Sequence, residues 1–454
     1  MTISLINAIR NGGSSQAAGS VLTLDPSLEA DIVARGDARF VWGADPSRPS
    51  RSALDRQADR GASIATKCVN GLMDVASHGA DRNTHIQMTT EAHFDAVRVI
   101  LFNAQATTQT GVKAAVGVAA AAGAHLATQS FTPDTWVDVT WATVSSVTQA
   151  AGAAARPSIT VSDWMPIQSL ERTDGGRFPL LHVRVYQPAA NANITKFSPS
   201  GIETWMQTAE RMHRVMVKDG SDMIATKGSF TAPATAPRWV PFAIQYMARG
   251  RVATLAVAGD SIAVGVGATN YFQSQYMRVC ETLSEPSGPI ELANFGWAGQ
   301  TSVNYFNRTM DLLSNGVIGA GHVLVFHAFS PNDYTTAVTQ AGVNASLSQT
   351  TQIVQKAIEK LARPVIVDAM PANPASKNWD ATDSLRRDFN GRLAAYTRIP
   401  VVGMSAAVSG AVDADGQTNI LSDSTSDNLH PNEVGIRRIL GPTLQALAPE
   451  LMAA

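Results

Sequence analysis

The 454-residue sequence is poor in cysteine and in charge. Its only two cysteines, Cys68 and Cys280, are far apart in the chain, which argues against a disulfide framework and against a Cys-x-x-Cys metal site. We therefore expect two buried thiols. Charged residues make up 16% of the chain and the formal net charge is −2, so there is no global positive field to collect nucleic acid or anionic lipid.

Targeting and membrane-spanning signals are also missing. The first 13 residues lack the basic and apolar regions of a secretory signal. The longest apolar stretch, residues 114–127, is mostly alanine, contains Gly117 and Gly123, and is too short to cross a bilayer. We expect no membrane insertion, and a cytoplasmic location unless the chain leaves the cell by another route.

Length and composition indicate a well-packed protein of two or three domains, because 45% of the residues are hydrophobic. Residues 1–60 show little periodicity and carry turn-forming clusters such as Asn-Gly-Gly-Ser-Ser at 11–15. They predict an extended N-terminal arm or linker.

Residues 61–248 predict an antiparallel β-sandwich. Short β-type runs lie between turn signals at 94–102, 136–141, 158–161, 180–186 and 239–246. Every second residue is apolar within 136–141 and 181–186, which predicts strands with one face on the core and the other in water. One helix is expected at 202–217.

Residues 249–454 change to an alternation of strands and helices. Continuous apolar runs occur at 252–258, 290–295, 322–328, 364–369 and 400–404, as in a buried parallel sheet. Apolar stripes at helical spacing occupy 343–361 and 382–396. This rhythm predicts a doubly wound α/β domain, whose reactive groups lie at the carboxyl ends of the strands.

A serine stands at the end of the first of these strands. Residues 258–262 read Ala-Gly-Asp-Ser-Ile and place Ser261 where a helix begins. Its hydroxyl can attack a carbonyl carbon, while its own backbone N–H can help to hold the resulting oxyanion.

A candidate base for this serine lies near the chain's end. Residues 427–431 read Asp-Asn-Leu-His-Pro. His430 can take the serine proton, and Asp427, three residues earlier, can fix the histidine tautomer and stabilise the imidazolium.

Two further strand-end clusters offer hydrogen-bond donors for an oxyanion. Residues 294–301 (Asn-Phe-Gly-Trp-Ala-Gly-Gln-Thr) include Gly299, whose backbone N–H a substrate can approach. Residues 330–333 (Ser-Pro-Asn-Asp) include Asn332, whose side-chain amide is a donor. Trp297 is equally compatible with a substrate pocket and with plain core.

These four clusters, in this order, resemble the conserved blocks of the SGNH (GDSL) hydrolase family from about residue 252 to the C-terminus. The resemblance maps the family's Ser, Gly, Asn and His onto Ser261, Gly299, Asn332 and His430, and it makes Asp427 the third triad member. It implies a flavodoxin-like three-layer α/β/α domain that hydrolyses esters or thioesters without a metal or another cofactor.

One departure concerns the third block. The family usually carries Gly-x-Asn-Asp there, whereas this chain has Ser330 and Pro331 before Asn332. A proline fixes φ and lacks a donor, so it constrains the loop that aims the amide.

The remaining histidines carry weaker signals. His322 and His327 flank an apolar run and are expected to be packed or satisfied by backbone groups, because no carboxylate or thiol partner lies at metal-ligand spacing. His85 and His93 are expected at the surface.

Residues 21–36 resemble N-terminal stretches of bacteriophage and prophage tail-associated proteins. This implies a virion component, often a trimer, that acts on an acetylated surface polysaccharide. The leading hypothesis is an O-acetyl esterase, with the sandwich as a binding or positioning module. A non-catalytic glycan-binding adhesin or structural tail protein, and a lipase or thioesterase, remain alternatives.

Overall fold

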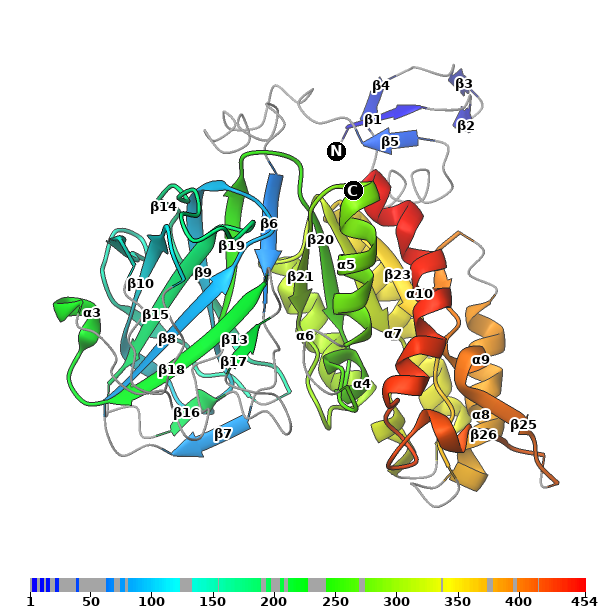
Figure 1. Ribbon diagram of the computed structural model, residues 1–454. Coiled ribbons are helices and arrows are strands. Elements are labelled where there is room, and N and C mark those ends of the chain that lie inside the picture. Colours follow the sequence, from blue (N-terminus) through cyan, green and yellow to red (C-terminus); the bar gives the residue numbers. More distant parts are fainter. Residues whose placement is uncertain are drawn as a thin grey trace.

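The structure is a computed structural model of the 454-residue chain. It describes, with side chains, residues 63–68, 81–122, 133–153, 155–188, 211–227, 242–268, 274–284, 288–333, 338–373, 382–394, 398–414 and 416–454. Of the other residues it describes only the backbone of short strands and of helix ends. Figure 1 shows a β-rich half beside an α/β half.

The β-rich half contains two antiparallel sheets. The seven-stranded sheet has the order β11-β10-β15-β8-β18-β17, with β12 also paired to β10. Its strands are β8 (Arg82–Thr89), β10 (Gln109–Ala119), β11 (Thr135–Asp138), β12 (Val147–Gln149), β15 (Leu180–Gln187), β17 (Trp205–Gln207) and β18 (Met212–Asp219).

The second sheet has five strands in the order β13-β9-β19-β6, with β14 also paired to β9. Its strands are β6 (Ser63–Lys67), β9 (Phe94–Asn103), β13 (Ser158–Val161), β14 (Met165–Pro166) and β19 (Phe242–Ala248). Buried side chains of both sheets, such as Val99, Val116, Val183 and Ile244, share one apolar cluster. The predicted antiparallel β-sandwich is confirmed.

The helix predicted at 202–217 is wrong. That segment contributes β17 and most of β18, and β18 pairs with β8 over seven residues from His213 to Asp219. The apolar residues can be read at helical spacing, but pairing on both sides of β18 satisfies its backbone and buries His213 and Arg214 as well. Tertiary pairing has overridden the local pattern.

The predicted water-facing side of β15 is also wrong. All eight residues of β15 are buried, including His182 and Arg184. A second layer covers them: the Arg184 guanidinium lies 4.7 Å from the Trp136 ring centroid and donates to the carbonyl of Met223, in α3 (Met223–Thr226), at 3.0 Å.

His85 belongs to this buried layer, which corrects its predicted surface position. It is fully buried, and its Nε2 lies 3.1 Å from Nδ1 of His182. Burial lowers the pKa of His182 to about 3 and the pKa of His85 well below its usual value. Both rings are therefore neutral at pH 7, so each can donate from one nitrogen and accept at the other.

The α/β half is built on a five-stranded parallel sheet. Its order is β21-β20-β22-β23-β24, with β20 (Ala253–Ala258), β21 (Ile290–Asn294), β22 (His322–His327), β23 (Arg363–Val367) and β24 (Val401–Val402). This order is the flavodoxin-like one, in which the chain winds in both directions from β20. All five predicted strands are present.

Helices cover both faces of this sheet. Side chains from α6 (Ser302–Ser314), α7 (Gln340–Glu359) and α8 (Trp379–Leu393) share an apolar cluster with strand residues such as Ala256 and Phe326. Side chains from α5 (Gln275–Ser287), α9 (Met404–Val408) and α10 (Glu433–Ala453) share another with Leu255 and Val325. Neighbouring strand residues thus face opposite helical layers, which confirms the predicted α/β/α architecture.

The two halves are joined by strand pairing. β6 lies at the edge of the sandwich sheet, and the residue after it, Cys68, pairs in parallel with Ala293 of β21. Two residues earlier, the Thr66 N–H donates to Thr254 Oγ1 at 3.0 Å. The apolar cluster of the sandwich also continues into the α6 side of the α/β layers. The sandwich is therefore held firmly against the parallel sheet.

Both predicted buried thiols are confirmed. Cys68 and Cys280 are free and buried. Burial raises the pKa of Cys68 to about 12, although the nearby Arg308 opposes this shift. Neither thiol is a reactive thiolate at neutral pH.

Short strands occur in the predicted N-terminal arm. β1 (Thr2–Leu5) pairs with β4 (Val21–Thr23) and β5 (Ala38–Phe40), and β2 (Ile9–Asn11) pairs with β3 (Ser14–Gln16). A further pair joins β7 (Asp74–Ser77) and β16 (Asn193–Lys196). The rest of the arm, including most of segment 21–36, lies outside the described residues. The domain boundaries after residues 60 and 248 remain predictions.

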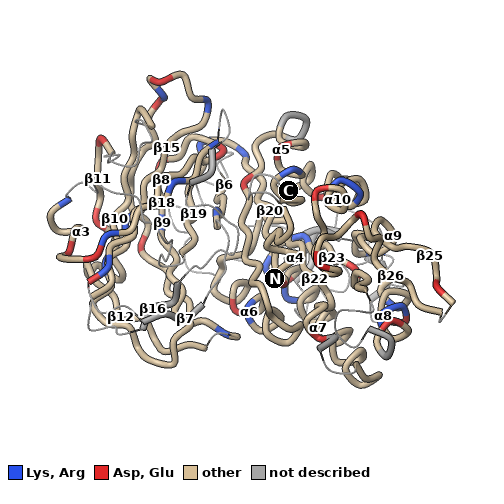
Figure 2. The backbone as a smooth tube through the Cα atoms, turned by 60° about the horizontal axis from the view of Figure 1, so that its bottom comes forward, with Lys and Arg blue, Asp and Glu red and all other residues tan. Residues whose placement is uncertain are grey.

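Basic and acidic residues lie interspersed along the described chain, as Figure 2 shows. None of the helices in the described part of the chain is both long and apolar enough to cross a membrane.

Candidate active site

Ser261 lies at the carboxyl end of β20, as predicted. It is the first residue of the single-turn helix α4 (Ser261–Val264) and its exposed fraction is 7%. The Asp260 carboxylate caps α4 by accepting from the Ile262 N–H at 2.9 Å. A Cβ on Gly259 would lie 2.8 Å from the Ala263 Cβ, so the glycine lets the strand turn tightly into the helix.

His430 and Asp427 meet this serine from the opposite end of the chain. His430 Nε2 lies 2.8 Å from Ser261 Oγ, and His430 Nδ1 lies 2.5 Å from Asp427 Oδ2. The His430 side chain is 18% exposed and that of Asp427 is 51% exposed. Solvent therefore reaches the His430 imidazole, which lies between the Ser261 hydroxyl and the Asp427 carboxylate.

The Asp427 carboxylate is poised in its ionised form. Its partial burial opposes ionisation, but hydrogen bonds from the His430 ring and from the backbone outweigh that effect and lower the pKa of Asp427 below its usual value. Its Oδ1 accepts from the His430 N–H at 2.8 Å and from the Leu429 N–H at 3.1 Å. Oδ1 thus accepts from the backbone of the same loop, while Oδ2 faces the His430 imidazole.

The segment that carries these two residues, 421–432, is here called the acid–base loop. It contains the short helix η3 (Ser422–Ser424), and an isolated bridge pairs Thr425 with Pro431. Asn428 adopts φ +67°, the left-handed conformation that Asn tolerates better than most residues. A Cβ on Gly267 would lie 2.2 Å from the Pro431 carbonyl oxygen, so the chain after α4 packs directly against this loop.

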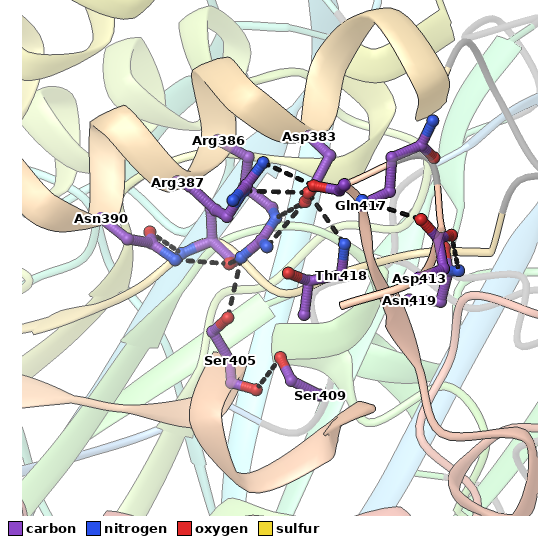
Figure 3. A network of polar contacts seen from close by, with 12 residues as sticks. Asp383, Arg386, Arg387, Asn390, Ser405, Ser409, Asp413, Gln417, Thr418 and Asn419 are labelled. Atoms are coloured by element: carbon purple, nitrogen blue, oxygen red, sulfur yellow. Dashed lines mark hydrogen bonds and ion pairs between the residues drawn. The ribbon is translucent and has the colours of Figure 1, made fainter. Parts of the chain in front are cut away.

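A buried polar network supports the entry to the acid–base loop (Figure 3). Asp383 accepts from Arg386 at 2.7 Å and, with its second oxygen, from the Thr418 N–H at 2.9 Å. Thr418 begins β26 (Thr418–Ile420), which pairs with β25 (Ser409–Val412) and runs into the loop. Arg386 also donates to Ser405 Oγ at 2.8 Å and to the Ala369 carbonyl at 3.2 Å.

The loop after β23 contacts the acid–base loop as well. The Asn373 N–H donates to the Asn428 carbonyl at 3.1 Å, and the Ile420 N–H donates to the Ala372 carbonyl at 3.0 Å. Helix α8, the loop after β23 and the β25–β26 hairpin therefore form one framework behind the histidine.

The two predicted oxyanion donors come from neighbouring loops. Gly299 is exposed and has φ +76°, a conformation that favours glycine. The Asn332 side-chain Nδ2 donates at 3.0 Å to the carbonyl of Gln300, the residue that follows Gly299. The structure thus brings the second and third motif clusters together.

Pro331 is accommodated without distorting the third cluster. It is the first residue of the short 3₁₀ helix η2 (Pro331–Thr335), where its fixed φ suits the helix and its missing donor has no role. Asp333 closes the turn, because its carboxylate accepts from the backbone N–H groups of Ser330 and Ser302 and from the Ser302 hydroxyl. Burial raises the pKa of Asp333 above its usual value.

The sequence indicates no role for the side chains of two residues in this region. Ser330 is fully buried and its hydroxyl donates to Asp260 Oδ2 at 2.6 Å. Arg308, also buried, donates to the Gly259 carbonyl at 3.2 Å and lies 5.0 Å from the centroid of the Trp297 ring. Trp297 is 4% exposed and belongs to the core cluster, so the plain-core alternative holds.

The other predicted histidines contribute nothing to this site. His327 is buried against the Tyr276 hydroxyl at 2.9 Å, and His322 accepts from the Gly319 N–H at 2.8 Å, so the packed reading is confirmed for both. His93 is partly exposed beside Glu171. Within the described residues no three His, Cys, Asp or Glu side chains gather as metal ligands would.

Comparison with known proteins finds a match for this part of the chain. The sequence model of the GDSL-like lipase/acylhydrolase family matches residues 257–438. That range holds all five predicted site residues. No curated protein sequence matches the chain.

Three of the solved structures that are similar to part of this chain are named here. A lipase/acylhydrolase from Enterococcus faecalis is 18% identical, covering 43% of this chain and 96% of its own, with a TM-score of 0.33. A lipolytic G-D-S-L family protein from Veillonella parvula is 18% identical, covering 43% and 97%, with a TM-score of 0.34. An acetyl xylan esterase is 17% identical, covering 43% and 99%, with a TM-score of 0.34.

Proposed function

We propose that residues 257–438, which match the sequence model of the GDSL-like lipase/acylhydrolase family, form a carboxylic ester hydrolase whose catalytic triad is Ser261, His430 and Asp427. One observation carries the proposal. The imidazole lies between the hydroxyl and the carboxylate, 2.8 Å from Ser261 Oγ and 2.5 Å from Asp427 Oδ2.

The geometry supports acyl transfer in two steps. His430 Nε2 removes the Ser261 proton as Oγ bonds to the ester carbonyl carbon, and the carbonyl π electrons move to the oxygen. Ionised Asp427 holds the Nδ1 proton and stabilises the imidazolium. His430 then protonates the leaving alcohol, and a water molecule activated by the same histidine releases the acid.

The developing oxyanion needs donors near Ser261. We propose the backbone N–H groups of Ser261 and Gly299 and the side-chain amide of Asn332. Support comes from the Asp260–Ser330–Asn332 hydrogen-bond chain, which ties the amide to the residue before the nucleophile.

The test is hydrolysis of p-nitrophenyl acetate by the wild type and by Ser261→Ala. We expect the variant to keep the wild-type melting temperature and to lose activity by roughly 10⁴-fold or more. A folded Ser261→Ala protein with wild-type activity would end the proposal.

We further propose that the ester is an O-acetyl group on a polysaccharide. The support is architectural: the sandwich is fixed to the α/β layers by the Cys68–Ala293 pairing and by a shared core, so a glycan held on it would keep a set position relative to Ser261. Acetate release from acetylated polysaccharide, compared with p-nitrophenyl esters of increasing chain length, tests this. A preference for long acyl chains would instead favour the lipase or thioesterase alternative.

A place in a phage tail remains a further proposal, and it rests on segment 21–36. It predicts that the chain sediments with phage particles from an induced lysate and binds host polysaccharide as an oligomer. Glycan binding without labelling of Ser261 by a fluorophosphonate would favour the non-catalytic adhesin. Recovery only from the soluble cell fraction would favour a cytoplasmic enzyme.

A further inference from the structure

Ser330 stands where the resembling motif has glycine, and its side chain lies between two parts of the site. The residue is completely buried. Its Oγ lies 2.6 Å from Asp260 Oδ2 and 2.9 Å from the Gln300 carbonyl oxygen. It also lies 3.1 Å from the backbone nitrogen and 3.3 Å from the side-chain nitrogen of Asn332.

The chemistry of a hydroxyl decides how these four contacts are used. Ser330 has one hydrogen to donate and two lone pairs that accept. The hydrogen goes to Asp260 rather than to the Gln300 carbonyl, because the Asp260 contact is shorter and its acceptor is a carboxylate. The lone pairs then face the two N–H groups of Asn332. Ser330 therefore accepts from the residue that we propose as an oxyanion donor.

The other end of this chain is equally fixed. Asp260 is fully buried, and its second oxygen accepts from the Ile262 N–H at 2.9 Å. Because Asp260 immediately precedes Ser261, its hydrogen bond with Ser330 fixes the position of Ser330 relative to the proposed nucleophile. The hydrogen-bond path from nucleophile loop to amide is two bonds long.

The Asn332 amide has two hydrogens, and the contacts separate their tasks. One donates to the Gln300 carbonyl at 3.0 Å, a normal hydrogen bond that sets the amide plane. The other faces Ser330 at 3.3 Å, which is a weaker contact. A substrate oxyanion would replace this weaker contact, whereas Ser330 would still hold the backbone N–H of Asn332 at 3.1 Å and so keep the residue in place.

We propose that Ser330 is a positioning residue that aims the Asn332 amide at the oxyanion by bridging it to Asp260. This inference rests on the proposed function, in which Asn332 stabilises the oxyanion. It assigns a task to the side chain by which this chain departs from the glycine of the family pattern.

A double-mutant cycle tests the inference. Ser330→Ala is expected to lower kcat for p-nitrophenyl acetate roughly tenfold with KM changed less than about twofold, whereas Asn332→Ala lowers kcat by roughly 10²-fold. In the Asn332→Ala background, Ser330→Ala should lower kcat by less than about twofold, because the group through which it acts is already gone.

Controls separate positioning from a loss of structure. Ser330→Gly lacks the same hydroxyl and should match Ser330→Ala, so it serves if the alanine variant folds poorly. Thr350→Val removes another buried hydroxyl, one that bonds within α7, and should leave kcat unchanged.

Two results would overturn the inference: an unchanged kcat in both Ser330 variants, or the same tenfold loss in the Asn332→Ala background. Neither result would touch the proposed catalytic triad, which fails if activity survives Ser261→Ala.

Discussion

Replacing Asp427 with asparagine should damage catalysis through the histidine tautomer rather than through the fold. In the native loop, Asp427 Oδ1 accepts from the N–H groups of His430 and Leu429, and Oδ2 faces His430 Nδ1. The amide oxygen of Asp427→Asn will keep the two backbone donors. Its NH₂ group must then point at Nδ1.

An NH₂ group at that position donates to Nδ1 and leaves the ring proton on Nε2. Nε2 then cannot accept the proton of Ser261, which lies 2.8 Å away. In a buried triad this change lowers kcat by about 10⁴-fold. Asp427 is 51% exposed, so water compensates part of the lost charge, and we expect a loss of roughly 10³-fold.

Asp427→Ala provides the contrast. Alanine removes the carboxylate oxygen that accepts from the backbone N–H groups of His430 and Leu429, so it should destabilise the acid–base loop by about 1–3 kcal/mol. It does not, however, impose the wrong tautomer on His430. We therefore expect Asp427→Asn to melt closer to the wild type and yet to be no more active than Asp427→Ala. The assay is kcat/KM for p-nitrophenyl acetate together with thermal melting. A clearly more active asparagine variant would refute the reasoning.

Three further predictions concern the framework of the site. Arg386→Met should lower the free energy of unfolding by about 1–3 kcal/mol, because it removes two donors to one oxygen of the buried Asp383 carboxylate and leaves the ion pair of the other oxygen with Arg387, at 3.0 Å. Arg392→Met, in an exposed ion pair, should change it by less than about 1 kcal/mol in denaturant melts. Burial raises the pKa of Asp368 to about 7, so native Asp368 keeps a proton that the unfolded chain loses near pH 4. As the pH rises from about 4 to 7, the free energy of unfolding of the wild type should therefore fall by roughly 1.4 kcal/mol per pH unit relative to that of Asp368→Asn. Parallel pH–stability curves for the two proteins would contradict this. Gly267→Ala should lower both melting temperature and kcat, since its φ is +99° and its Cβ would meet a carbonyl of the acid–base loop at 2.2 Å; a normal kcat would show that the loop adjusts freely.

Patterns in the sequence predicted the α/β half well because each of its signals is local. Strands such as β20 and β22 are apolar on both faces. When such continuous apolar runs alternate with helical stripes, few structures other than a buried parallel sheet fit the pattern. Ser261 and His430 were found because motifs at strand ends restrict the chemistry. Their 2.8 Å approach needs the fold, since 169 residues separate them.

Features that depend on distant neighbours could not be predicted. The sequence pattern of β18 favours a helix, because its pairing with β8, about 130 residues away, has no local signature. His85 was expected in water because nothing nearby announces that Trp136 and α3 cover that face of the sheet. The hydrogen bond from Ser330 to Asp260 joins residues 70 positions apart, and the spacing within either motif does not predict it.

The central claim is that His430 activates Ser261, and the most direct measurement is the rate and site of fluorophosphonate labelling, mapped by mass spectrometry of peptides. Our account predicts one adduct, on Ser261, and a labelling rate at least roughly 10³-fold lower in a folded His430→Ala variant. An adduct on another residue, or equal rates in the two proteins, would contradict it.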